Sequence, residues 1–275
     1  TYAGRLLAVL GQADAAVHPG YQLRVQTLGG FRVWRGSTEV GPGAWPRDKA
    51  RQLFQLLLTE RGRWMQREAL VDRLWPMLAP AAAGRDFKVA LNALNRVLEP
   101  GRSADAPFAY VVRDGTTYRL RPEADLWLDA VAFEQAATLA LQADGAPREH
   151  MIPALEAARA LYTGDYLPEA CYEDWATAER ERLRGLYLRV AERLADAQLA
   201  AQRPDLAVIL AEEILSRDPC WERAYQLLMR AHLQSGNRAQ AVRTYARCQA
   251  ALAAELGVAP GVATTELYTQ AVAGA

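Results

Sequence analysis

The sequence predicts a mainly α-helical protein whose small β-sheets lie in its first half. Three observations support this. Residues 21–34 alternate apolar and polar side chains, as half-buried strands do. Three amphipathic segments and an Asp-Gly turn between short apolar runs follow, and from Leu126 onward helical segments alternate with brief Gly, Pro or Asp breaks. At 275 residues, the chain is long enough for two domains.

The first two helices are expected at residues 47–61 and 67–75. Each places its apolar side chains at spacings of three and four, which gathers them on one face. Gly62 separates the two segments. The apolar positions are Ala50, Leu53, Phe54, Leu57 and Leu58 in the first helix, and Leu70, Val71 and Leu74 in the second.

The third helix is expected at residues 81–99, where Pro100 and Gly101 end it. Its buried stripe runs through Phe87, Leu91, Leu94 and Leu98. Residues 109–112 and 117–120 then flank an Asp-Gly pair, a strong hairpin signal. Three helices followed by a hairpin predict a winged helix-turn-helix domain over residues 21–122.

The second half predicts an all-α, tetratricopeptide-like domain over residues 123–275. Ala207 and Ala241 are 34 residues apart, the length of one such repeat, and small residues there let paired helices approach closely. Residues 1–20 are expected to be the end of an upstream region or a linker.

The distribution of charged residues also changes at the boundary between the two predicted domains. Residues 21–122 hold 17 Arg and Lys against 9 Asp and Glu, whereas residues 123–275 hold 14 against 22. A basic half beside an acidic half indicates that the first half meets a polyanion, and we expect double-stranded DNA.

The polar face of the third helix supplies the candidates for contact with DNA bases. Arg or Lys recognises guanine and Asn recognises adenine through paired hydrogen bonds in the major groove. An ordinary solvated face is the alternative, and the winged-helix context favours the DNA interpretation. The candidates are Arg85, Lys88, Asn92, Asn95 and Arg96.

Phosphate contacts are expected near the beginnings of the first two helices, where free backbone N–H groups also attract anions. The hairpin should act as a wing that reaches an adjacent groove or phosphate. The phosphate candidates are Arg47, Lys49, Arg51, Arg63 and Arg67, and those on the wing are Arg113, Thr116 and Arg119.

Nothing in the sequence predicts catalysis, a cofactor or a metal site. The three histidines, His18, His150 and His232, lack metal-ligand spacing, and no phosphate-binding loop motif is present. No apolar run approaches the roughly 18 residues of a membrane span, and no leader pattern opens the chain, so we expect a cytoplasmic protein.

Several sequence segments, in this order, resemble the Streptomyces antibiotic regulatory protein family, which joins an OmpR-type winged helix to a bacterial transcriptional activator domain. The resemblance covers about residues 22–270. The third helix is closest to a subgroup at the C-terminal end of large MalT-like ATPase regulators. The segments include LGGFRVWRG (28–36), KARQLFQLLL (49–58), REALVDRLWP (67–76), RDFKVALNALNRVLEP (85–100) and ALYTGDYLPE (160–169).

The resemblance implies a transcriptional activator whose helical domain forms a homodimer or contacts RNA polymerase. One departure concerns Ala93 and Asn95, where the usual pattern has basic residues, which predicts either weaker phosphate binding or phosphate binding shared with the wing. Two alternatives stay open: a protein-interaction scaffold that has lost DNA binding, and a helical domain that senses a small-molecule or nucleotide effector.

Overall fold

The computed structural model describes residues 22–103, 105–142 and 147–273, and the chain forms two compact units. Unit 1 contains the described residues up to Ala132 together with Leu161–Arg184. Unit 2 contains Phe133–Ala160 and the described residues from Gly185 onward. The predicted upstream segment, residues 1–20, lies outside the described residues.

Unit 1 contains a four-stranded sheet in the order β3-β2-β1-β7. Strands β1 (Leu23–Gln26), β2 (Arg32–Arg35) and β3 (Thr38–Glu39) are antiparallel, and β7 (Leu126–Leu128) runs parallel to β1. The expectation of helix from Leu126 onward is wrong for β7. Leu126 pairs with Leu23 and Leu128 pairs with Val25, so residues 126–128 extend the sheet as a strand, with the Leu128 side chain buried.

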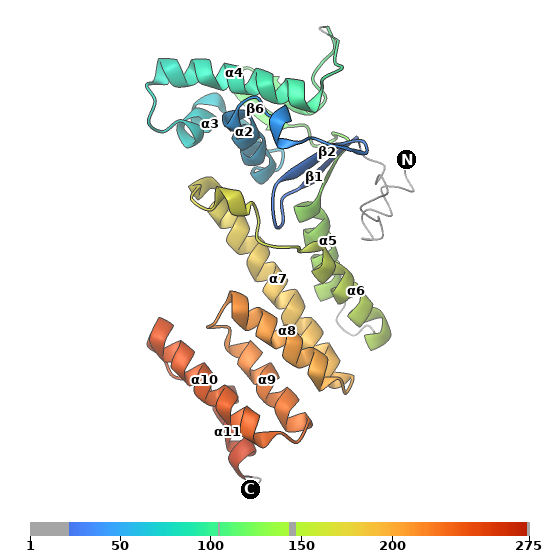
Figure 1. Ribbon diagram of the computed structural model, residues 1–275, viewed down its shortest axis with the longest axis vertical. Coiled ribbons are helices and arrows are strands. Elements are labelled where there is room, and N and C mark those ends of the chain that lie inside the picture. Colours follow the sequence, from blue (N-terminus) through green and yellow to red (C-terminus); the bar gives the residue numbers. More distant parts are fainter. Residues whose placement is uncertain (1–21, 104, 143–146, 274–275) are drawn as a thin grey trace. The chain divides into compact units, whose positions relative to one another are not determined.

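Three helices and a second sheet complete the winged-helix part of unit 1. After the turn η1 (Pro42–Ala44), helices α2 (Asp48–Thr59), α3 (Arg67–Leu74) and α4 (Pro80–Leu98) follow, and α4 lies across the other two (Figure 1). Strands β4 (Met65–Gln66), β5 (Val111–Asp114) and β6 (Thr117–Leu120) form a sheet in the order β4-β6-β5. The hairpin turn uses Gly115 at a φ of 54°, a left-handed conformation that glycine adopts without strain.

The rest of the described chain is helical apart from short connections. Helices α5 (Asp129–Gln142) and α7 (Asp174–Ala200) each have residues in both units, α6 is Arg148–Leu161, and the turn η2 is Pro168–Ala170. Helices α8 (Pro204–Arg217), α9 (Glu222–Gln234), α10 (Arg238–Leu256) and α11 (Val262–Ala273) pack successively in unit 2. None of the described helices is long and apolar enough to cross a membrane.

Small buried side chains explain the close helix packing in unit 2. Ala207 on α8 and Ala241 on α10 are both fully buried at the expected interval of 34 residues. Tyr245 on α10 stacks on Tyr268 of α11, with ring centroids 4.3 Å apart. The fold is therefore the predicted one, mainly helical with small sheets and a helical repeat.

Asp129, the first residue of α5, connects that helix to the sheet of unit 1 through hydrogen bonds of its side chain. Its carboxylate accepts hydrogen bonds from the Thr27 backbone N–H (2.8 Å), the Thr27 hydroxyl (2.7 Å), the Leu28 N–H (2.8 Å) and the Ala130 N–H (2.7 Å). Burial raises the pKa of Asp129 to about 6, while these donors act in the opposite direction. The residue thus satisfies buried backbone groups at the end of β1 and at the beginning of α5.

The segment from Thr163 to Leu167 also packs against the end of β1. The Thr163 hydroxyl donates to the Leu28 carbonyl (2.6 Å), and the Leu167 N–H donates to the Thr27 carbonyl (2.8 Å). The Gly29 N–H donates to the Asp165 carbonyl (3.0 Å). Residues expected in separate domains therefore belong to one unit, because the backbone groups of each segment bond to the other.

We predict that Asp129→Asn lowers the free energy of unfolding. The amide that replaces one carboxylate oxygen cannot accept hydrogen bonds, so buried donors of Thr27 or Leu28 lose their partner, at a cost of about 2 kcal/mol. Urea unfolding followed by circular dichroism measures this. Asp174→Asn is the control, since Asp174 also begins a helix but is exposed, and it should change stability by less than about 0.5 kcal/mol. Equal effects of the two changes would contradict the role assigned to Asp129.

Candidate nucleic-acid interface

One face of α4 exposes polar and basic side chains. Arg85, Lys88, Asn92 and Arg96 are all exposed, at successive offsets of three, four and four residues. This spacing keeps them on one side of the helix. The side chains of these four residues make no hydrogen bond or ion pair with another described residue. This face of α4 therefore offers hydrogen-bond donors, and the acceptor oxygen of Asn92, to a ligand.

Asn95 is the exception among the sequence-based candidates for base contact. It is 7% exposed, and its Oδ1 has no hydrogen-bond partner among the described residues. The reason lies in the helical period, because Asn95 follows Phe87 and Leu91 at intervals of four residues and so lies beside the buried stripe. Its placement among the exposed base-contact residues was thus wrong.

Val89 was missed because only polar side chains were considered. It is 42% exposed and follows Arg85 by four residues, so it belongs to the same face. The sequence does contain a signal for Val89, because this apolar residue lies outside the buried stripe of the helix. A valine there offers methyl groups, which can contact the methyl group of thymine.

Packing from three elements supports α4 from behind. Phe87 contacts Trp75 at the end of α3 and Tyr118 on β6, with ring centroids 6.4 and 5.1 Å apart. Beyond the last turn, the Glu99 carboxylate accepts hydrogen bonds from the N–H groups of Ala109 (3.0 Å) and Tyr110 (3.2 Å). These contacts hold the exposed face of α4 in a fixed orientation within unit 1.

The phosphate candidates on α2 differ in accessibility. Arg47 is exposed at the N-cap of α2, where backbone N–H groups also lack helical partners. Lys49 is half-buried, with its amine 5.8 Å from the centre of the Trp75 ring, and Arg51 is half-buried with an unpartnered Nε. Arg47 is therefore the most available of the three.

The two candidates near α3 are both paired with a glutamate, but they differ in exposure. The Arg63 side chain is 82% exposed, with Glu60 3.4 Å away. The Arg67 guanidinium lies 2.8 Å from the Glu68 carboxylate, and its backbone N–H donates to the Thr116 carbonyl (2.9 Å). Arg63 can thus turn toward a phosphate more easily than Arg67.

Of the wing candidates, Arg113 lies near the end of β5, Thr116 lies in the hairpin turn and Arg119 lies on β6. Arg113 donates to the Gly115 carbonyl (2.7 Å), and the Thr116 hydroxyl donates to Gln66 (2.9 Å). Arg119 instead lies over the Trp64 ring, 4.4 Å from its centre, and is half-buried. Arg113 and Thr116 are therefore both exposed near the hairpin turn, whereas Arg119 packs against Trp64.

No cluster of three or more His, Cys, Asp or Glu side chains suited to a metal ion occurs among the described residues. Burial raises the pKa of Tyr110 to about 12, so its hydroxyl remains protonated and can donate a hydrogen bond. The exposed groups on α4 offer hydrogen bonds and positive charge.

We predict that Asn95→Leu raises the free energy of unfolding by about 1 kcal/mol, because it removes a buried acceptor that has no partner. The comparison variant is Asn92→Leu, three residues earlier on the exposed face, which should change stability by less than about 0.5 kcal/mol. Chemical denaturation of both variants gives the answer. A greater loss of stability in Asn95→Leu would show that the amide makes a necessary bond.

The chain is similar to several known regulatory proteins. Residues 128–271 match the bacterial transcriptional activator domain. The chain is 30% identical over 246 residues to the regulatory protein AfsR of Streptomyces coelicolor, which covers 89% of this chain and 24% of AfsR. It is 27% identical over 246 residues to the regulatory protein DnrI of Streptomyces peucetius, covering 86% of this chain and 88% of DnrI.

A solved structure shares the fold. Mycobacterium tuberculosis EmbR, in complex with a low-affinity phosphopeptide, superposes with a TM-score of 0.79 at 21% identity, over 92% of this chain and 66% of EmbR. The chain spans about a quarter of the length of AfsR. The expected resemblance to Streptomyces antibiotic regulatory proteins is confirmed.

Proposed function

Because the chain belongs to the bacterial transcriptional activator domain family, we propose that it is a DNA-binding transcriptional activator that recognises a specific sequence. The observation that carries this proposal is the exposed face of α4, whose cations and amide have no partners among the described residues. The named regulators AfsR and DnrI support it. We assign DNA contact to residues 21–122 and contacts with other partners to the helical region from residue 123.

In this proposal α4 enters the major groove. Arg85 and Lys88 contact guanine, Asn92 pairs with adenine, and Val89 packs against a thymine methyl group. The buried side of α4 is fixed by Phe87, so the four side chains meet the bases with little loss of conformational entropy on binding. Such contacts carry the choice of sequence.

Phosphate contacts set the position of the protein on the duplex. We assign them first to Arg47 and Arg63, which are exposed, and the wing contact to Arg113 and Thr116. Lys49, Arg51, Arg67 and Arg119 have more restricted side chains and would contribute less. Each phosphate neutralised makes the slope of log K against log salt more negative by about 0.9.

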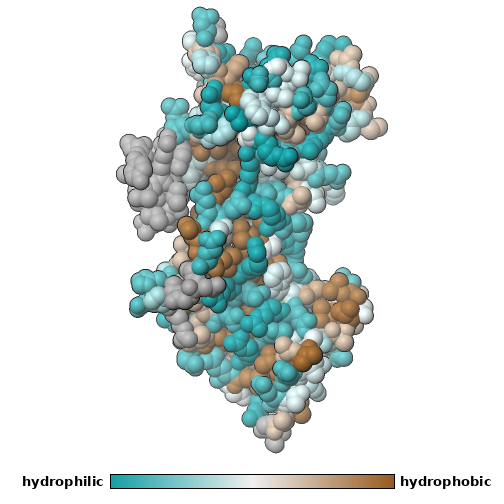
Figure 2. Space-filling view, turned by 180° about the vertical axis from the view of Figure 1, so that it is seen from behind, coloured by the Kyte–Doolittle hydropathy of each residue, from teal (hydrophilic) through white to brown (hydrophobic). Residues whose placement is uncertain are grey.

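Unit 2 is the part that we assign to protein contacts. Leu206 and Ile209 are exposed three residues apart on α8, and hydrophobic surface appears among the hydrophilic residues of this unit (Figure 2). Exposed apolar groups favour association with another protein. The candidate partners are RNA polymerase and a second copy of the chain, in the cytoplasm. A small-molecule or nucleotide effector remains a further proposal for this unit.

We predict that the protein selects a defined motif from a library of random duplexes. With that motif, Asn92→Ala should weaken binding by about 1–3 kcal/mol and relax the preference at one base pair, because a paired contact to a base is lost. Fluorescence anisotropy measures the affinity. Gln249→Ala on α10 removes an exposed amide from unit 2 and should leave affinity unchanged. Unselective binding, or none, would refute sequence-specific recognition by this chain.

We predict a different pattern for Arg47→Ala. A phosphate contact carries no sequence information, so affinity should fall about equally for all duplexes, and the salt slope should become less negative by about one. Titrations at four salt concentrations test this. A change in the preferred base would show instead that Arg47 reads sequence.

A further inference from the structure

Arg35 interrupts the apolar inner face of the four-stranded sheet. It pairs in register with Leu23, and cross-strand partners share a face. The neighbouring inward residues Val25 and Val33 are buried hydrophobic side chains, whereas Arg35 is a half-buried cation. A charge held against the core lowers stability unless a partner compensates for its lost hydration.

Other arginines of the same sheet have such partners. Arg32, on the opposite face of β2, lies 2.7 Å from the Glu39 carboxylate, and Arg24 lies 4.0 Å from the centre of the Trp34 ring. The Arg35 side chain has no hydrogen bond, ion pair or ring contact with any described residue. Its position therefore calls for an external partner.

A small hollow of about 220 Å³ brings Arg35 together with Arg96 of α4. Its other lining residues are apolar, and no carboxylate lies among them. Arg96 also has no partner among the described residues. Two like charges that share one hollow repel each other unless an anion lies between them. The apolar lining residues are Ala44, Pro46, Ala93 and Val97.

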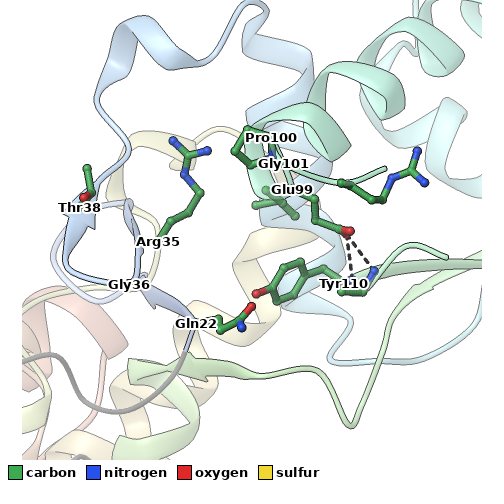
Figure 3. Close-up of a pocket in the computed structure, with 11 residues that line it drawn as sticks. Gln22, Arg35, Gly36, Thr38, Glu99, Pro100, Gly101 and Tyr110 are labelled. Carbon is green, nitrogen blue, oxygen red and sulfur yellow. Dashed lines mark hydrogen bonds between the residues drawn. The ribbon is translucent and has the colours of Figure 1, made fainter. Parts of the chain in front are cut away.

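On its other side Arg35 borders a groove of about 750 Å³, where its side chain extends from β2 toward Pro100 (Figure 3). The one carboxylate lining this groove, that of Glu99, is held by the N–H groups of Ala109 and Tyr110. The Glu99 carboxylate is thus hydrogen-bonded to backbone N–H groups and forms no ion pair with Arg35.

We infer that Arg35 and Arg96 together hold one phosphate group of the DNA backbone at the C-terminal end of α4. Planar guanidinium groups match phosphate oxygens through paired hydrogen bonds. DNA is the favoured source of the phosphate, because Arg96 is also the last residue of the exposed face that carries Arg85, Lys88 and Asn92. The inference rests on the proposed DNA binding and extends that interface from α4 to β2.

The first test compares Arg35→Gln, Arg96→Gln and the double variant on the selected motif. Each single change should weaken binding about tenfold and make the salt slope less negative by about 0.9, with base preference retained. Because both residues hold the same phosphate, the slope of log K against log salt should change no more in the double variant than in either single variant. Arg32→Gln is the matched control: it removes one charge from the other face of β2 and should leave the slope unchanged.

A second test identifies the phosphate directly. Duplexes with one neutral methylphosphonate at each position in turn are titrated with the protein and with Arg35→Gln. At the contacted position the affinities of the two proteins should become equal, whereas elsewhere the difference should persist. No such position among all those tested would overturn the inference. Thermal unfolding of Arg35→Gln, expected to be at least as stable, excludes misfolding as the cause of weak binding.

A third test separates DNA from free phosphate. Calorimetric titration with inorganic phosphate should show no saturable binding below millimolar concentration. Saturable binding that Arg35→Gln abolishes, with an unchanged DNA salt slope, would assign the hollow to a free anion and overturn the inference. If Arg35→Gln and Arg32→Gln behave alike while Asn92→Ala still weakens binding, this inference fails and DNA recognition stands. If no motif is selected at all, the proposed function itself fails.

Discussion

The carboxylate of Asp129 satisfies the backbone at a point where three segments of unit 1 meet. The end of β1 turns at Thr27 and Leu28, whose N–H groups have no strand partner and would otherwise be buried without hydrogen bonds. Both oxygen atoms of a carboxylate accept hydrogen bonds, whereas a neutral asparagine side chain of similar size has only one accepting oxygen. The same residue begins α5, so its position also fixes where β7 ends and the helix begins.

Glycine makes the neighbouring contact possible. A Cβ atom on Gly164 would lie 2.7 Å from the Gly29 Cα, closer than real Cβ atoms approach, so the two backbones could not lie side by side with larger residues. Arg180 on α7 then donates to the carbonyl groups of Tyr166 (3.0 Å) and Ala170 (2.8 Å). The segment that follows α6 therefore has its backbone groups satisfied partly by the sheet and partly by α7.

These contacts explain why the sequence predicted the elements better than their grouping. The periodicity of Phe87, Leu91, Leu94 and Leu98 specifies the buried side of α4 locally, and the Asp-Gly pair specifies the hairpin turn. The pairing of Gly29 with Gly164 depends on residues 135 positions apart, which no local pattern records. Strand β7 was missed for the same reason, because its three residues become a strand only beside β1.

The candidate interface shows a similar division between local and long-range information. Helical spacing identified Arg85, Lys88, Asn92 and Arg96, since their exposure follows from the period of α4 alone. Asn95 was misplaced because it lies at the boundary of the stripe, where neighbouring elements decide whether a residue is covered. Arg35 could not be found from β2 alone, because its significance comes from Arg96, 61 positions later.

The ion pairs of unit 1 show which of its arginines remain available to bind a polyanion. Several arginines are neutralised locally, such as Arg32 by Glu39, Arg67 by Glu68 and Arg73 by Glu60. The exposed cations of α4 have no such partners among the described residues. A polyanion therefore gains more from contact with α4 than from contact with the outer face of β2, although both surfaces carry arginine. Net charge indicates a polyanionic partner, and the arrangement of acids around each base indicates which face that partner meets.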